Sequence, residues 1–282
     1  MSEAKSANEI DDPLVPVPIP EQVAAQEGFA ALPGARLWYW DTGGSGEPVV
    51  LLHPATGSAL IWLYQQPAFA NAGYRVIAYS RRNHYNSDTA RAEDPGIASE
   101  DLHQLMQFLG VNKFHAVSSA AGGGVASDYA FSHPERLLSL TVCSNNLSAK
   151  NGYIADTAAR IRPKEEEILP RWFWELGPSY RAANPEGLAE WKARHDRSGK
   201  RAPARLKNKF TWETLGKLRV PTLLMTGDAD LWIPPFLLRK VGEKIPNITV
   251  VIVSDAGHAI QWERPEAFNA AVLGFIRSNP TR

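Results

Sequence analysis

One stretch in the middle of the chain has the residue pattern that presents a catalytic nucleophile, but an alanine occupies its central position. The apolar run 114–117 is typical of a buried strand, and glycines follow it at 122–124. A nucleophile at the tip of such a strand-to-helix turn sits in strained backbone, so the residues two before and two after it must be small. Ser118 and Gly122 meet this demand around Ala120. The sequence therefore predicts the turn of a nucleophile without its attacking oxygen.

Two other interpretations of this stretch remain open. Ser119 could be the nucleophile, but Ala121 rather than a glycine would then lie two residues on, and Ser119 lies one residue before the tip of the turn. Alternatively, the glycines only allow the helix to pack closely on the strand. Both interpretations compete with Ala120 as the nucleophile position.

Asp230 and His258 are the residues best suited to general-base chemistry. Each closes a short loop, 226–230 and 254–258, and each loop follows an apolar run typical of a strand. A histidine can take the proton of a nucleophile and return it to the leaving group, while a carboxylate fixes its tautomer and stabilises the imidazolium. Asp228, in the first of these loops, is expected to hydrogen-bond within its turn.

The surrounding sequence alternates between strand and helix patterns. Apolar runs predict strands at 48–53, 74–79, 114–117, 138–143, 220–225 and 249–253, and helical periodicity predicts helices at 99–109, 122–132 and 235–245 and from Pro265 onward. We expect Ser99 to cap the first of these helices and Gly110 to end it. The rhythm predicts an α/β protein with a doubly wound, mainly parallel sheet. Two short runs, 29–32 and 37–40, predict an N-terminal antiparallel hairpin.

Three kinds of segment are expected along the chain. Residues 1–24 form an extended arm, because four prolines between positions 13 and 20 deny a regular ladder its donors. Residues 25–147 and 217–282 form the core that carries the sheet. Residues 148–216 interrupt the rhythm with helical, tryptophan-rich sequence and predict a helical cap inserted over the sheet.

Together these motifs resemble those of the α/β hydrolase superfamily. Residues 118–136 resemble its nucleophile elbow and following helix, with Ser118 for the first glycine and Ala120 for the serine. The loops that end at Asp230 and His258 resemble its acid and histidine loops, and the chain order is the one that the superfamily uses. The resemblance covers residues 29–278. It implies the α/β hydrolase fold and a catalytic triad at these three positions.

The resemblance also implies an oxyanion hole. Segment 53–57 is similar to the HGxxG loop of the family, with Pro54 for its usual glycine, and segment 82–87 is similar to its RGxGxS loop. The backbone N–H groups of Ala55 and Ala121 would then face the developing negative oxygen.

Contacts with the substrate are expected from two segments. His84 and Tyr85 could border the pocket, and Trp172 and Trp174 of the cap could form a hydrophobic wall for an apolar or aromatic acyl group. Arg82 is expected to form a buried ion pair that shapes its loop rather than to contact substrate.

Composition excludes several other classes of protein. Thirty basic and thirty acidic residues balance, so no nucleic-acid partner is expected. The single cysteine, Cys143, is expected to be a buried thiol, and no spacing of cysteines or histidines suggests a metal site or a phosphate loop. No cofactor is implied. The first residues lack the pattern of a secretory signal and no apolar run could cross a bilayer, so a cytoplasmic protein without membrane contact is expected. The oligomeric state stays open.

The resemblance implies a capped serine hydrolase, an esterase or lactonase that acts on a small hydrophobic or aromatic substrate through an acyl intermediate on residue 120. With alanine there, we expect hydrolysis to be slower by at least about a thousandfold. The leading hypothesis is a serine replaced by alanine, which makes this chain an inactivated variant. Two alternatives are a natural non-catalytic receptor or scaffold, and an enzyme that uses His258 as a base without a serine.

Overall fold

The computed structural model describes residues 12, 14–149, 152–161, 168–199 and 204–281. In these residues eight strands form one sheet in the order β1-β2-β4-β3-β5-β6-β7-β8. The predicted hairpin is confirmed: β1 (Gln26–Leu32) and β2 (Ala35–Asp41) pair antiparallel around a turn in which Gly34 has a φ of 82°. β2 continues antiparallel against β4 (Arg75–Tyr79).

The rest of the sheet is parallel, as predicted. It contains β4 and five further strands: β3 (Pro48–Leu52), β5 (Phe114–Ser119), β6 (Leu137–Cys143), β7 (Thr222–Gly227) and β8 (Ile248–Val253). Strands buried on both faces read as continuous apolar runs, which is why these segments were recognisable. In the sheet, β4 lies on one side of β3 and β5 lies on the other, so the strand order reverses direction at β3. The crevice of a doubly wound sheet lies at such a reversal, beyond the carboxyl ends of the strands.

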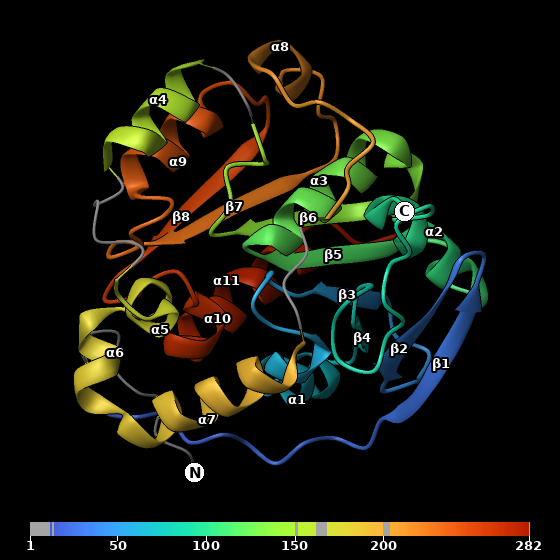
Figure 1. Ribbon diagram of the computed structural model, residues 1–282, viewed down its shortest axis with the longest axis horizontal. Helices are drawn as coiled ribbons and strands as arrows, with labels where there is room; N and C mark the ends of the chain where they lie inside the picture. Colours follow the sequence, from blue (N-terminus) through green and yellow to red (C-terminus); the bar gives the residue numbers. More distant parts are fainter. Residues whose placement is uncertain (1–11, 13, 150–151, 162–167, 200–203, 282) are drawn as a thin grey trace.

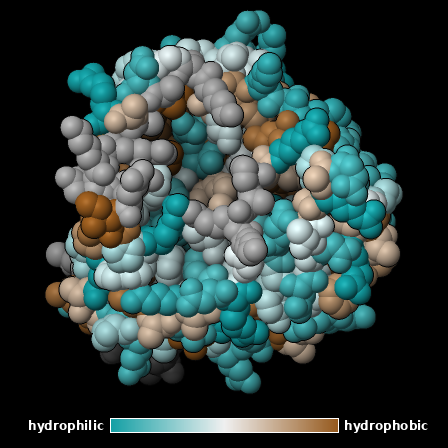
Figure 2. All heavy atoms as spheres, in the orientation of Figure 1, coloured by the Kyte–Doolittle hydropathy of each residue, from teal (hydrophilic) through white to brown (hydrophobic). Residues whose placement is uncertain are grey.

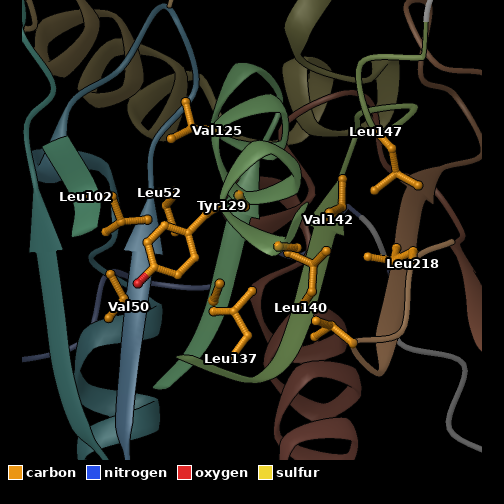
Figure 3. Close-up of a cluster of buried hydrophobic side chains, with 14 of the residues drawn as sticks. Val50, Leu52, Leu102, Val125, Tyr129, Leu137, Leu140, Val142, Leu147 and Leu218 are labelled. Atoms are coloured by element: carbon orange, nitrogen blue, oxygen red, sulfur yellow. The ribbon is translucent and has the colours of Figure 1, made fainter. Parts of the chain in front are cut away.

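Helices cover both faces of the sheet (Figure 1). On one face lie α2 (Ala98–Phe108), α3 (Ala121–Ser132) and α9 (Pro235–Gly242), and on the other lie α1 (Gln65–Asn71) and α11 (Pro265–Arg277). Tyr129 of α3 is buried among strand residues such as Val50 and Leu140, within a cluster that fills the space between α3 and the sheet (Figure 3). A core on each face holds the loops of one sheet edge in fixed positions.

The chain between β6 and β7 is helical where the structure describes it. It contains α4 (Gly152–Ile161), α5 (Arg171–Glu175), α6 (Pro178–Ala183), α7 (Pro185–Arg197) and α8 (Trp212–Leu215). A separate hydrophobic cluster packs the helices α5, α6 and α7 against the core. In it, Tyr180 of α6 and Trp191 of α7 contact Trp262 of α10 (Ile260–Glu263) and Tyr64, which precedes α1. The helices thus lie beside α1 and α10 (Figure 1).

Two details differ from the sequence-based expectations. Ser99 does not cap α2, because the helix begins one residue earlier and the Ser99 hydroxyl donates instead to Asp128 Oδ2 of α3 at 2.5 Å. A charged acceptor in a buried site competes successfully with the local cap. The short helices α1 and α10 have no counterpart among the predicted elements. Gly110 does follow the end of α2, with a φ of 66°.

Residues 16–25, which precede β1, lie extended across the outside of the fold (Figure 1). Tyr64 donates from its hydroxyl to Val17 O at 3.0 Å, and the Gln66 amide pairs with both the N–H and the carbonyl of Val23. In the described part of the chain, no helix is long and apolar enough to cross a membrane.

Candidate active site

The chain turns sharply between β5 and α3, and Ala120 lies at the tip. Its φ of 47° and ψ of −118° are a costly conformation for a residue with a Cβ, by about 1–3 kcal/mol. The Ala120 N–H donates to Cys143 O at 2.8 Å, which ties the tip to β6. At Gly122 an added Cβ would lie 2.2 Å from Leu52 O of β3. The turn therefore depends on a glycine at 122 to bring α3 against the sheet.

Asp230 and His258 meet at the carboxyl ends of β7 and β8. The Nδ1 atom of His258 lies 2.9 Å from each carboxylate oxygen of Asp230. Asp230 Oδ1 also accepts from the N–H groups of Trp232 and Ile233, at 2.8 and 3.0 Å. The Thr226 hydroxyl donates to Oδ2 at 2.8 Å. The buried carboxylate thus has several donors, which favour its charged form.

The two groups stabilise each other's charge. Burial alone would raise the pKa of Asp230, but His258 and the surrounding donors hold it below its ordinary value. Burial alone would lower the pKa of His258, but the Asp230 carboxylate raises it above its ordinary value. With Nδ1–H donating to Asp230, the neutral ring presents Nε2 as a proton acceptor. This arrangement is able to act as a general base.

A cavity of about 340 Å³ joins these groups. Ala55, Ala120, Ala121 and His258 all line it. On the face drawn in Figure 1 the molecule is hollowed near its middle (Figure 2). The volume falls in the range of small-molecule sites, about 300–1,000 Å³.

Two backbone N–H groups lie next to the tip of the turn. Ala55 follows β3, and Ala121 is the first residue of α3, where helical N–H groups have no acceptor within the helix. Among the residues that the structure describes, neither N–H has a backbone acceptor. Both are therefore available to a ligand oxygen in the cavity.

Ser118 and Ser119 direct their hydroxyls away from this cavity. Ser118 donates to Thr141 O at 2.7 Å, and Ser119 donates to Gln261 Oε1 at 3.2 Å. Both side chains are buried. The structure does not bring Ser119 to the position expected of a nucleophile.

The four residues predicted to contact substrate do not line the cavity. His84 lies beneath the neighbouring loop, with its ring nitrogens 2.9 Å from Arg82 O and 3.2 Å from Ala55 O. Tyr85 packs edge-to-face on Trp38, with ring centroids 5.0 Å apart. Asn83, in the same loop, has a φ of 68°.

The tryptophans of α5 lie one layer behind the cavity. Trp174 is buried against Trp232, with ring centroids 6.0 Å apart, and Trp232 lines the cavity instead. Trp172 packs against the cluster around Trp191. Of Trp172, Trp174 and Trp232, only Trp232 lines the cavity.

Polar side chains that sequence reasoning had not assigned to the cavity line much of it. They include Thr56, Arg171 and Glu175, together with Asn145 and Asn146. The Thr56 hydroxyl donates to Glu175 Oε2 at 2.8 Å. Trp232 lies two residues after Asp230, so its place in the loop offered a signal. No local pattern marked Arg171 or Glu175.

The end of α5 is tied to the histidine loop by its backbone. Glu175 O accepts from the N–H groups of His258 and Ala259, each at 3.0 Å. Glu263 receives three more N–H groups, from Gly177, Gly257 and Ala259. Burial raises the pKa of Glu263 to about 7, although these donors favour its anion. Two chain segments far apart in sequence are thus held together behind His258.

Arg82 forms the buried ion pair expected of it. Its Nε and Nη2 atoms donate to the two carboxylate oxygens of Asp101, at 2.8 and 2.9 Å. Cys143 is a buried thiol, as expected. In the described ranges no three histidine, cysteine or acidic side chains form a group that could hold a metal ion.

Comparison with known proteins agrees with the fold. Residues 49–271 match the model of the alpha/beta hydrolase family. Because the match spans most of the chain, the protein belongs to this family.

Similar proteins span nearly the same length. A candidate carbamate hydrolase, RutD, from Caulobacter sp. (strain K31) is 28% identical over 252 residues, covering 82% of this chain and 90% of that protein. A 2-hydroxy-6-oxononadienedioate/2-hydroxy-6-oxononatrienedioate hydrolase from Burkholderia vietnamiensis is 24% identical over 262 residues, with 86% and 91% covered.

Among solved structures, a thermophilic esterase from Thermogutta terrifontis superposes with a TM-score of 0.73 at 24% identity, covering 91% of this chain and all (100%) of that one. The enol-lactonase from Burkholderia xenovorans LB400 has a TM-score of 0.73 at 24% identity, with 89% and 100% covered. These likenesses establish the fold.

Proposed function

We propose that the cavity is the substrate site of a serine hydrolase for a carboxylic ester or lactone, and that Ala120 occupies the nucleophile position. The observation that carries this proposal is the backbone of Ala120. A φ of 47° is unfavourable for alanine and serves no purpose of its own there, yet it places the residue in the same cavity as His258. The chain as it stands lacks the attacking hydroxyl.

The other groups have defined roles in this proposal. A hydroxyl at position 120 would give its proton to His258 Nε2 as it attacked the acyl carbon, and the leaving group would receive that proton. Asp230 would hold the imidazole by Nδ1 and stabilise its charged form. The N–H groups of Ala55 and Ala121 would bind the oxygen that becomes negative.

The environment of the cavity supports a small acyl substrate. Trp232, backed by Trp174, gives the site an apolar wall, while Thr56 and Glu175 give it a polar side. We assign the helices α5 to α7 the role of a cap over this side of the site. The relatives named as an esterase, an enol-lactonase and hydrolases of oxo-dienoate acids support acyl or related bonds as the target class.

The direct test is Ala120→Ser, assayed with p-nitrophenyl acetate and butyrate and with small lactones. We expect hydrolysis to increase by at least about a thousandfold over the unaltered chain. Adding His258→Ala should remove that gain. Adding Ser119→Ala should preserve it, because the Ser119 hydroxyl is bonded to Gln261 outside the cavity.

Two outcomes contradict the proposal. A folded Ala120→Ser protein without any gain would mean that the site is not built for this attack, as in a receptor or scaffold. Hydrolysis by the unaltered chain that His258→Ala abolishes would mean that His258 acts as a base without a nucleophile on the chain.

A further inference from the structure

A buried arginine lies beneath the loop that carries Ala55. Arg81 lies two residues after the end of β4 and is 6% exposed. No carboxylate among the described residues pairs with it, in contrast to its neighbour Arg82, which binds Asp101. Burial lowers the pKa of Arg81 to about 10, so the guanidinium keeps its charge at neutral pH. A buried charge without an opposite charge beside it costs folding free energy, so we asked what Arg81 does at this position.

The guanidinium is directed at the carbonyl groups of one loop. Its Nη2 atom donates to Pro54 O at 3.0 Å and to His53 O at 3.1 Å. His53 lies beside it, with Nδ1 2.7 Å from the same Pro54 O and Nε2 accepting from the Arg81 backbone N–H at 3.0 Å. Burial and the nearby Arg81 hold the pKa of His53 well below its ordinary value, so the ring is neutral.

The Pro54 carbonyl belongs to the same peptide group as the Ala55 N–H. In a trans peptide the C=O and N–H bonds point in opposite directions. When Pro54 O faces the buried Arg81, the Ala55 N–H is directed to the other side of the loop, where Ala55 lines the cavity. A cation at the oxygen end of a peptide polarises it and makes its N–H a stronger donor.

We propose that Arg81 is a positioning residue that orients and polarises the Pro54–Ala55 peptide, so that the Ala55 N–H binds the oxygen of an acyl substrate as it becomes negative. This role rests on the proposed function. It places a positive charge one peptide away from the reacting oxygen, without contact between the charge and the substrate.

The loop that carries Ala55 is expected to keep its position without Arg81. The Pro54 carbonyl also accepts from His53 Nδ1 at 2.7 Å and from the Gly57 N–H at 3.3 Å, so the loop does not depend on Arg81 alone for its position. Replacing a buried charge with an apolar side chain of similar volume is often neutral or stabilising. Arg81→Met should therefore keep the fold while it removes the polarisation.

The first test needs no catalysis and uses the chain as it exists. Labelling proline with carbonyl ¹³C and alanine with ¹⁵N gives linked signals only from Pro-Ala pairs, of which the sequence has three, at 54–55, 67–68 and 203–204. Arg81→Met should move the Pro54 carbonyl and Ala55 nitrogen signals upfield, because the carbonyl loses a charged donor. The 67–68 signal should stay in place.

Two further variants complete this test. Arg81→Lys keeps a charge and should leave the 54–55 signal between those of the unaltered and Met chains. Arg75→Met removes the arginine at the other end of β4, which is paired with Asp41, and should leave the signal unchanged. An unmoved 54–55 signal in folded Arg81→Met or Arg81→Lys protein would overturn the inference.

The second test is kinetic and uses the Ala120→Ser background. Arg81→Met should lower kcat by about tenfold or more, less than the loss of a whole oxyanion donor, with KM little changed. Arg81→Lys should recover part of the rate. Equal changes in kcat and KM, or no change, would contradict the role. If Ala120→Ser gains no hydrolysis, the proposed function fails, and the labelling test still decides the effect of Arg81 on the peptide.

Discussion

The turn at Ala120 and the ring of His258, which pairs with Asp230, line one cavity but differ in what they contribute to it. The turn at Ala120 has a strained backbone but no reactive side chain. Asp230 and His258 both have reactive side chains, and Nδ1 of His258 lies 2.9 Å from Oδ1 of Asp230. Gly122 and the bond from Ala120 N to Cys143 O hold the turn, and neither involves the side chain of residue 120. The backbone geometry of the turn is therefore independent of the side chain at position 120.

The largest expected effect tests the pair. In the Ala120→Ser background, Asp230→Asn should lower kcat by about ten-thousandfold, because the amide no longer holds the histidine in the tautomer that leaves Nε2 free to accept a proton. Asp228→Asn is the matched control, since Asp228 is exposed in the same loop. Comparable losses in the two variants would show that the loop matters rather than the pair.

A second substitution tests the turn without touching the pair. In Gly122→Ala the new Cβ would lie 2.2 Å from Leu52 O, so α3 or β3 must shift. We expect the free energy of unfolding to fall by about 1–3 kcal/mol, as for overpacking, measured by urea denaturation. Gly274→Ala in α11, where the added Cβ meets no atom within 4 Å, should instead be stabilising by about 0.5–1 kcal/mol. An unchanged stability in Gly122→Ala would mean that the turn is not held by this contact.

The smallest expected effect is the pH dependence of the pair. Since Asp230 raises the pKa of His258, the Ala120→Ser rate should fall by about tenfold per pH unit below a pKa that lies above the ordinary 6.5. The interaction that raises the pKa of His258 also stabilises the fold. This contribution is complete below pH 6.5 and is lost as the pH rises through the pKa of His258 in the folded protein. Titration of His258 by NMR checks the sign: in Asp230→Asn burial dominates and its pKa should fall below 6.5. A rise would contradict the pairing.

Much of the fold and the centre of the site were predictable because their signals are local. Continuous apolar runs marked the parallel strands, and residues such as Asp230 and His258 come directly after them. The carboxyl ends of parallel strands meet at one edge of a sheet, so recognising the loops was enough to bring Ala55 and Ala120 to the same place.

The remainder depended on contacts between distant segments. The Ser99 hydroxyl had a good local partner as a cap but bonds to Asp128 of another helix. Glu175 reaches the cavity only because α5 docks on the histidine loop, which no sequence period encodes. The docking of α5 also sets the position of Trp174. We expected this side chain at the surface of the pocket, but it lies behind Trp232.

The backbone bonds from His258 and Ala259 to Glu175 O have a mechanical consequence. Residues 175–177 cannot move away from the core independently, because the same motion would pull His258 away from Asp230. An engineer who grafts a different set of helices between β6 and β7 would need to keep Glu175 to Gly177 as a fixed anchor and vary the chain on either side of it.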